Sequence, residues 1–257
     1  MKCYTAIALE GFPLIIEGQN IAEEIVEVAA RNSIKLENGD VIAIAQKIVS
    51  KAEKRVIDLK KVIPSEKARK IGAKTAKSPR FIQLVLNESS RVLKATPGIL
   101  LVEDRRGLIC INAGIDKSNV EGSTNFALLP QNPDQSAEKC RQEIGRITGC
   151  DVAVIICDTY SRPFRTGQVN FSIGVSGLKP FKDYRTKKDL FGQVLKVKNV
   201  AIVDEIAAAA ELLMGQANEA RPVVIFKGLM EIVEPCDACR SSDLFISKQE
   251  DLFKGTL

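Results

Sequence analysis

The stretch that decides the fold is residues 152–159, which read VAVIICDT. Its first five residues are apolar and mostly β-branched, a composition typical of a strand buried on both faces. Asp158 and Thr159 follow directly, so an acidic and a hydroxyl side chain are expected at the tip of a rigid strand. Strand tips at a sheet rim are common positions for ligand-binding residues. The stretch therefore predicts a buried sheet with polar chemistry at one edge.

Other segments predict the rest of the fold. Strands are expected at residues 41–44, 108–111 and 223–226. Apolar periodicity and capping residues predict helices at residues 21–28, 65–77, 80–90, 134–149 and 205–214. These elements do not alternate cleanly as βαβ units, so we expect an α+β fold with mixed β-sheets and flanking helices, neither Rossmann nor P-loop. Residues 1–257 are expected to form a single domain, or two intertwined subdomains with the irregular stretch 173–199 between them.

The absence of histidine is the most informative feature of the composition. It excludes every Ser-His-Asp and Cys-His mechanism and every imidazole metal site. A catalytic metal would need oxygen ligands, which favours magnesium, manganese or calcium. The Gly-rich loops of P-loop and dinucleotide-binding proteins are also missing, so any nucleotide is held by a less common scaffold.

The seven cysteines are expected to be reduced, since no secretory signal or membrane span is recognisable and a cytoplasmic location follows as the default. Cys110 and Cys157 lie in apolar runs and are expected to be small core residues. Cys236 and Cys239 have redox or zinc spacing, but a closed zinc site needs four ligands. A metal or thiol module centred on this pair is therefore a minor alternative.

The net charge of +5 indicates affinity for an anionic ligand or simply a solvated surface. A basic RNA-binding protein is a further alternative. It is disfavoured because the basic residues are spread along the chain and only three tyrosines and no tryptophan are available for base stacking. We expect neither a nucleic-acid partner nor a membrane partner.

Three polar segments are candidates for chemistry. Residues 158–168 carry Asp158 and Thr159, which can share a divalent cation, and two arginines whose planar guanidinium groups match phosphate. Residues 112–119 carry Asp116 and Asn119, where an Asx-rich turn that caps its own backbone is the plainer interpretation. Residues 46–51 leave the first predicted strand with two lysines, which either contact triphosphate oxygens or are solvated.

Taken together and in order, these segments resemble the coenzyme F420-0:L-glutamate ligases, also called F420 gamma-glutamyl ligases. The resemblance covers nearly the whole chain, and its co-occurring motifs are far more specific than any one of them. The matching stretches are residues 12–15, 39–53, 112–119, 128–137, 158–174, 183–192, 204–215 and 251–253.

The resemblance implies a family-specific gamma-glutamyl ligase fold and a GTP-dependent ligase that joins L-glutamate to the terminal carboxylate of a deazaflavin coenzyme precursor. It also implies two divalent cations, Mg²⁺ or Mn²⁺, assistance by K⁺, and a homodimer. The chemistry would be formation of an acyl phosphate from GTP, followed by attack of the glutamate amine.

The resemblance also implies roles for single residues. Asp116 and Asp158 resemble ligands of the first metal, and Thr159 and Gln216 those of the second. The residues that resemble the GTP pocket are Phe12, Pro13, Leu14, Ile15, Gln46, Lys51, Asn119, Met214, Gly215, Gln216, Ala217, Asn218, Glu219, Ala220 and Arg221. Apart from the resemblance, we predict that Lys51, Arg162 and Arg165 stabilise charge on the phosphates.

The sequence departs from the family pattern at several positions, and these departures bear on which acceptor the enzyme uses. Ser161 stands where the family usually has Gly, Tyr160 where it usually has Phe, and Cys157 where it often has Ser. The loop at residues 121–125 is also atypical. The same amide-forming chemistry on a folate or another pterin-like acceptor is therefore kept as an alternative.

Overall fold

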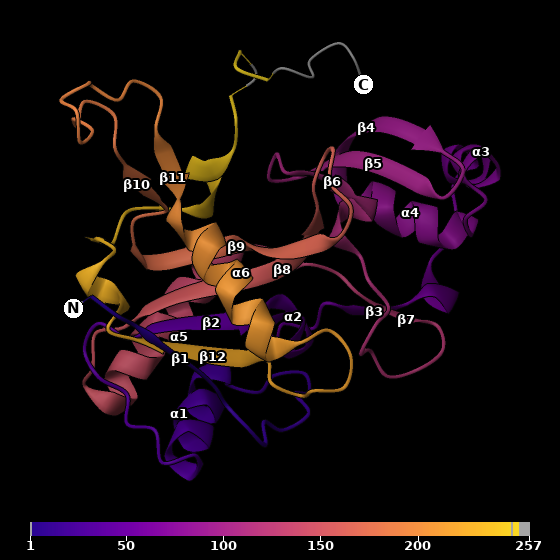
Figure 1. The fold of residues 1–257 in the computed structure, drawn as a ribbon. Helices are drawn as coiled ribbons and strands as arrows, with labels where there is room; N and C mark the ends of the chain where they lie inside the picture. The colour runs from indigo at the N-terminus through magenta and orange to yellow at the C-terminus, as the bar shows by residue number, and fades with distance from the viewer. Residues whose placement is uncertain (1, 248, 252–257) are drawn as a thin grey trace. The chain divides into compact units, whose positions relative to one another are not determined.

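The computed structural model describes residues 2–247 and 249–251, and the chain divides into two compact units (Figure 1). The first unit comprises Met1–Ala52 and Gln131–Leu244, and the second comprises Glu53–Pro130 and Phe245–Leu257. Residues 173–199 all belong to the first unit. The number of folding domains stays a prediction. Residues 252 and 253, from the matching stretch 251–253, lie outside the described residues.

The first unit alternates strands with a few long helices. Its elements are β1 (Thr5–Ala8), α1 (Ile21–Arg31), β2 (Val41–Ala45), α2 (Gln46–Ala52), α5 (Pro133–Thr148), β8 (Ala153–Ser161), β9 (Gln168–Leu178), β10 (Phe181–Asp183), β11 (Asn199–Ala201), α6 (Ile202–Met214), β12 (Val223–Lys227), η3 (Leu229–Glu231), β13 (Pro235–Cys236) and η4 (Ser241–Leu244).

A six-stranded sheet in the order β1-β12-β2-β8-β9-β13 forms the centre of this unit. Strands β2 and β8 are parallel, and the other neighbours are antiparallel. The sheet is therefore mixed, as predicted, and it is flanked by helices rather than built from repeated βαβ crossovers. This confirms the expected α+β class.

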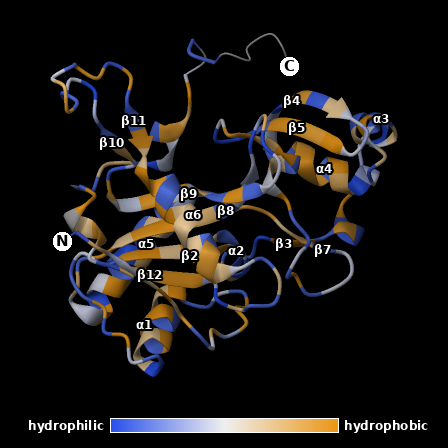
Figure 2. Cartoon of the chain, in the orientation of Figure 1, coloured by the Kyte–Doolittle hydropathy of each residue, from blue (hydrophilic) through white to orange (hydrophobic). Residues whose placement is uncertain are grey.

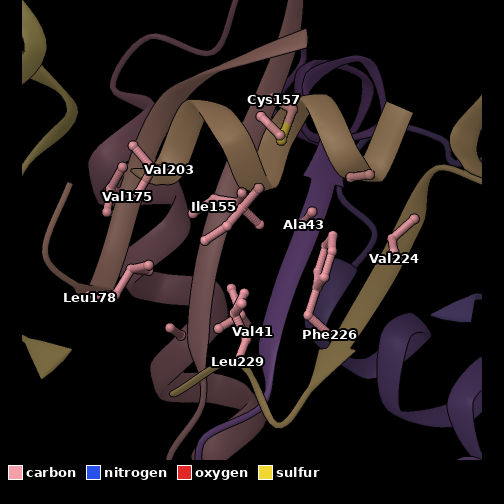
Figure 3. Close-up of a cluster of buried hydrophobic side chains, with 14 of the residues drawn as sticks. Val41, Ala43, Ile155, Cys157, Val175, Leu178, Val203, Val224, Phe226 and Leu229 are labelled. Atoms are coloured by element: carbon pink, nitrogen blue, oxygen red, sulfur yellow. The ribbon is translucent and has the colours of Figure 1, made fainter. Parts of the chain in front are cut away.

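Helix α6 covers one face of the sheet, and apolar side chains from several elements pack beneath it (Figure 3). Val41, Ala43, Ile155 and Cys157 alternate along β2 and β8, as expected for side chains on one face of a strand. Figure 2 shows these central strands mostly in the orange of hydrophobic residues. The residues between them, such as Ile42 and Ile156, are equally buried, because α5 packs on the other face of the sheet. The run that predicted the fold is thus buried on both faces.

The second unit contains two small sheets and two helices. Its elements are β3 (Val56–Asp58), η1 (Leu59–Lys61), α3 (Glu66–Thr75), α4 (Pro79–Asn87), β4 (Ser89–Thr96), β5 (Ile99–Asp104), β6 (Ile109–Ile111), η2 (Asn112–Gly114) and β7 (Asn125–Ala127). Strand β5 lies between β4 and β6, and β3 pairs with β7.

Several predicted boundaries differ from the structure, and two of them have a clear cause. The helix expected over residues 80–90 ends at Asn87, because Ser89 begins β4 and pairs with Asp104. The strand expected to end at Ile156 continues to Ser161, because Asp158 and its neighbours form a ladder with β9. Asp158 and Thr159 therefore lie inside a strand and not beyond its tip.

The prediction of reduced thiols is wrong for one pair of cysteines. Cys236 and Cys239 form a disulfide, since the turn between them brings their Cα atoms to 5.7 Å, within disulfide reach. A dithiolate zinc site on this pair is therefore not present. Cys110 and Cys157 are free and buried, as expected.

Among the described residues, none of the helices is both long enough and apolar enough to cross a membrane.

Candidate active site

Strands β8 and β9 position the central polar residues. A register shift between Ile156 and Cys157 marks a β-bulge at the point where β8 changes from apolar to polar. Bulges of this kind re-aim the side chains that follow and are frequent beside active sites. Beyond it, Asp158 pairs with Phe171, and Thr159 pairs with Asn170.

Asp158 and Thr159 point to opposite faces of the β8–β9 strand pair, because successive side chains in a strand alternate between its two faces. Thr159 follows Cys157 by two residues and shares its face, which is the face that α6 covers. This geometry suits two separate cations better than one cation shared by both side chains.

A chain of hydrogen bonds surrounds Thr159. Its hydroxyl donates to the Asn170 side-chain oxygen over 3.2 Å and accepts from the Gln216 side-chain amide over 2.8 Å. The same amide nitrogen of Gln216 donates to Glu211 over 2.5 Å. Asn170 is buried, and its amide nitrogen lies 3.9 Å from the sulfur of Met214. Three elements thus fix the orientation of four polar side chains.

Helix α6 delivers Glu211 and Met214 to this array and ends beside it. Gly215, at φ +69°, closes the helix by donating its N–H to the Glu211 carbonyl over 3.1 Å. A helix C-terminus carries partial negative charge and favours a cation nearby. The corner at Met214, Gly215 and Gln216 therefore suits a positive ligand.

The segment after this corner folds back on itself. The Glu219 carboxylate accepts from the Ala217 N–H over 2.8 Å and lies so close to Gly215 that a Cβ there would overlap it. The hydrogen bond from its own N–H and the one from Ala217 lower the pKa of Glu219. Arg221 lies 3.4 Å from Glu10. Ala217, Asn218, Glu219 and Ala220 are exposed and available to a ligand.

Several polar side-chain atoms of the first unit are buried without a hydrogen bond. They are Glu211 Oε2, Arg162 Nε and Arg221 Nε, all among the described residues. An unpaired buried donor or acceptor costs about 1–3 kcal/mol, so native proteins rarely leave one without a purpose. Each guanidinium donor suits an anionic oxygen of a ligand, and the carboxylate oxygen suits a cation.

Acidic side chains surround Cys157, which precedes Thr159 by two residues on β8. Burial, assisted by the charges of Asp204, Glu211 and Asp158, raises the pKa of the Cys157 thiol, which keeps it neutral. Desolvation raises the pKa of Asp204, and the hydrogen bond that its carboxylate accepts from the Ser172 N–H opposes this effect. Cys157 is therefore not a nucleophile but a small core residue.

Other predicted residues lie elsewhere in the first unit. Gln46 is buried at the start of α2 and accepts from the Ser50 hydroxyl over 2.8 Å, and Lys51 lies in the last turn of the same helix. Phe12 and Ile15 are buried, while Leu14 is exposed and Pro13 half-buried. Arg165 is exposed in the loop that joins β8 to β9.

Asp116 and Asn119 lie in the second unit, in a turn of unusual backbone geometry. Asn112, Ala113 and Gly114 all have positive φ, and a Cβ on Gly114 would meet the Leu129 side chain at 2.5 Å. The Asp116 carboxylate accepts from the Lys117 N–H, the Ser118 N–H and the Ser118 hydroxyl. These hydrogen bonds agree with the plainer prediction of a self-capping turn.

The donor atoms fit a hard divalent cation. Asp158, Thr159 and Glu211 carry only oxygen donors, and Gln216 carries an amide oxygen beside its nitrogen; oxygen donors are the ligands that Mg²⁺ and Mn²⁺ prefer. Within the described part of the chain, no three or more carboxylates and thiols gather as a ready-made metal site. Magnesium in particular is commonly held by one or two carboxylates together with phosphate oxygens of a substrate.

Sequence reasoning missed Glu211 and Asn170. Asn170 is the cross-strand partner of Thr159, and Glu211 precedes Gln216 by five residues around a helix end. No local pattern marks either one. The only signal in the sequence was that each is a polar residue with apolar neighbours, Asn170 between Val169 and Phe171 and Glu211 between Ala210 and Leu212.

Comparison with known proteins gives a consistent result. The family model described as F420-0:Gamma-glutamyl ligase matches residues 11–228. A protein of Methanocaldococcus jannaschii named Coenzyme F420:L-glutamate ligase is 42% identical over 249 residues, covering 97% of this chain and 96% of its own. A protein of Archaeoglobus fulgidus with the same name is 43% identical over 249 residues, with the same coverage.

Proposed function

This chain belongs to the F420-0:gamma-glutamyl ligase family, and from that premise we propose that it joins L-glutamate to the terminal carboxylate of a coenzyme F420 precursor at the expense of GTP. The observation that carries the proposal is the hydrogen-bonded array of Thr159, Gln216 and Glu211 at the C-terminus of α6, in which every side chain carries an oxygen suited to a hard cation. Membership in the family identifies the chain as a ligase.

The proposed reaction has two steps. The acceptor carboxylate attacks the γ-phosphorus of GTP, which releases GDP and forms an acyl phosphate. The glutamate amine then attacks the acyl carbon, loses a proton and expels inorganic phosphate, leaving an amide bond. Neither step requires an imidazole, which agrees with a chain that contains no histidine.

We propose Asp158, Thr159 and Gln216 as metal ligands in the first unit and Asp116 as a metal ligand in the second. Bound Mg²⁺ or Mn²⁺ would neutralise phosphate charge so that the anionic carboxylate is not repelled. Lys51, Arg162 and Arg165 would add positive charge, and the orphaned Nε of Arg162 supports this role for one of them. K⁺ and a homodimer belong to the same proposal.

We propose residues 12–15, Gln46, Lys51, Asn119 and residues 214–221 as the GTP-binding set. The exposed loop that follows Gln216, with the orphaned Nε of Arg221 at its end, supports the last of these segments. Gln46 is buried, so it would act by shaping α2 rather than by wide contact with the ligand.

The test is release of GDP and phosphate in the presence of Mn²⁺, L-glutamate and one acceptor at a time. Turnover that requires both glutamate and the deazaflavin precursor supports the proposal. Turnover with a reduced folate alone would keep the chemistry and change the acceptor. If no acceptor stimulates GTP turnover, the proposed function is wrong.

A further inference from the structure

The orientation of the Gln216 side chain is determined by its neighbours. Its amide nitrogen faces two oxygens, the Thr159 hydroxyl at 2.8 Å and the Glu211 carboxylate at 2.5 Å. The proton of the Thr159 hydroxyl is already donated to Asn170, so the threonine can only accept from Gln216. A flipped amide would place its oxygen against both of these oxygens.

Asn170 secures the threonine in turn. Its amide nitrogen is directed at the Met214 sulfur, which is a weak acceptor, and this leaves its oxygen for the Thr159 proton. Asn170, on β9, is buried and contacts Met214 of α6, so it has little freedom to turn. The orientation of the Thr159 hydroxyl is thereby fixed.

Glu211 restrains the orientation of Gln216 most strongly among these hydrogen-bonded residues, because an ionised carboxylate can accept but never donate a hydrogen bond. The Glu211 carboxylate accepts from the Gln216 NH₂ group over 2.5 Å and so holds that end of the amide toward it. Charge-assisted hydrogen bonds of this kind are about twice as strong as neutral ones. The consequence is that Gln216 turns its carbonyl oxygen away from Glu211, and this oxygen accepts no hydrogen bond among the described residues.

We propose that Glu211 is a positioning residue that holds the Gln216 carbonyl oxygen ready for a divalent cation, an inference that rests on the proposed function. Glu211 keeps the Gln216 carbonyl oxygen, rather than its NH₂ group, directed at the cation. The NH₂ group carries partial positive charge and would repel a cation. Groups that orient metal ligands in this way commonly change metal affinity by about 10- to 100-fold when removed.

The test measures Mn²⁺ binding by electron paramagnetic resonance of the free ion, in the presence of GDP and without turnover. Glu211→Ala is expected to weaken one class of Mn²⁺ site by about 10- to 100-fold. Glu211→Gln keeps an acceptor oxygen for the Gln216 amide but loses the negative charge, so its loss of Mn²⁺ affinity is expected to be clearly smaller than that of Glu211→Ala. Glu205→Ala, an exposed position on the same helix, is the matched control and should leave binding unchanged.

A double-mutant cycle separates positioning from direct ligation. Because Glu211 is argued to act through Gln216, Glu211→Ala should add no further loss to Gln216→Ala. If the Glu211→Ala variant does not fold, Glu211→Asp takes its place in the cycle, because the shorter side chain moves the acceptor oxygens away from Gln216 by the length of one methylene group. Thermal unfolding of every variant checks the fold.

The outcomes are distinct. Wild-type Mn²⁺ affinity in Glu211→Ala overturns the inference, and so does a loss in Glu211→Gln equal to that in Glu211→Ala, or additive losses in the double variant. If Gln216→Ala itself binds Mn²⁺ like the wild type, the metal assignment in the proposed function fails instead.

Discussion

At the scale of single residues, the candidate site is a set of polar side chains whose orientations are fixed by hydrogen bonds to one another. Thr159 is fixed by Asn170, and Gln216 is fixed by Thr159 and Glu211. Preorganised donors need no rearrangement when charge develops, which is why they contribute strongly to catalysis. The proposed ligand Asp158 would add an oxygen from the opposite face of β8.

Asp158→Asn is expected to lower GTP turnover by on the order of 100-fold, because a neutral amide replaces a carboxylate at a proposed cation ligand. The melting temperature should change little, since the residue lies at the half-buried end of β8. Steady-state kinetics at saturating Mn²⁺ measures the effect. Asp189→Asn, the same substitution in an exposed turn, should retain full activity. Equal activity in both variants would remove Asp158 from the site.

At the scale of elements, α6 joins the core to the site. Its apolar face covers the sheet, and its C-terminal turn carries Glu211 and leads into Gln216. Packing beneath the helix therefore determines where these side chains stand. The core residues Ile155 and Cys157 belong to the same strand as Asp158 and Thr159.

Ile155→Ala should lower the free energy of unfolding by roughly 2–5 kcal/mol, because it leaves a cavity in a fully buried position under α6. Urea denaturation measures this change. Ile147→Ala, on a partly exposed position of α5, should cost less than about 1 kcal/mol. Similar losses in the two variants would contradict the placement of the core.

The first turn of α6 predicts a pH effect on stability. Desolvation raises the pKa of Asp204 above its ordinary value of 3.8, so the folded state binds this proton more tightly than the unfolded state does. The free energy of unfolding therefore falls as the pH rises from about 3.8 through the folded-state pKa. Asp204→Asn, which keeps the acceptor for Ser172, should remove this fall.

Urea denaturation at pH 4 and pH 7 measures the effect. The stability of the wild type relative to Asp204→Asn should be lower at pH 7 than at pH 4. Glu205→Gln, the exposed neighbour, serves as the control and should follow the wild type. A constant difference between wild type and Asp204→Asn at the two pH values would show that Asp204 titrates normally.

The sequence predicted the buried parts of this architecture better than the polar parts. The strands β2, β8 and β12 and the end of α6 at Gly215 follow from apolar runs and a glycine cap, which are local signals. The continuation of β8 to Ser161 was missed, because polar residues form a strand there only through pairing with β9. Glu211 and Asn170 were missed for the same reason, since their roles depend on contacts between distant elements.

At the scale of the whole molecule, ligand binding should stabilise the fold. Mn²⁺ with GDP at about 100 times the dissociation constant would add about 2.7 kcal/mol, or roughly 5–10 °C in melting temperature for a chain of this size. Differential scanning fluorimetry measures the shift, and excess EDTA should abolish the part that depends on the metal. The absence of any shift would argue against a nucleotide–metal site.

The central claim is that the acceptor carboxylate is activated as an acyl phosphate. It is tested most directly with an acceptor whose terminal carboxylate carries ¹⁸O, incubated with GTP, Mn²⁺ and L-glutamate. Attack of that carboxylate on the γ-phosphorus and later expulsion of phosphate predict one ¹⁸O atom in the inorganic phosphate released, detected by mass spectrometry. Amide formation with no ¹⁸O in the phosphate would contradict the mechanism proposed for this chain.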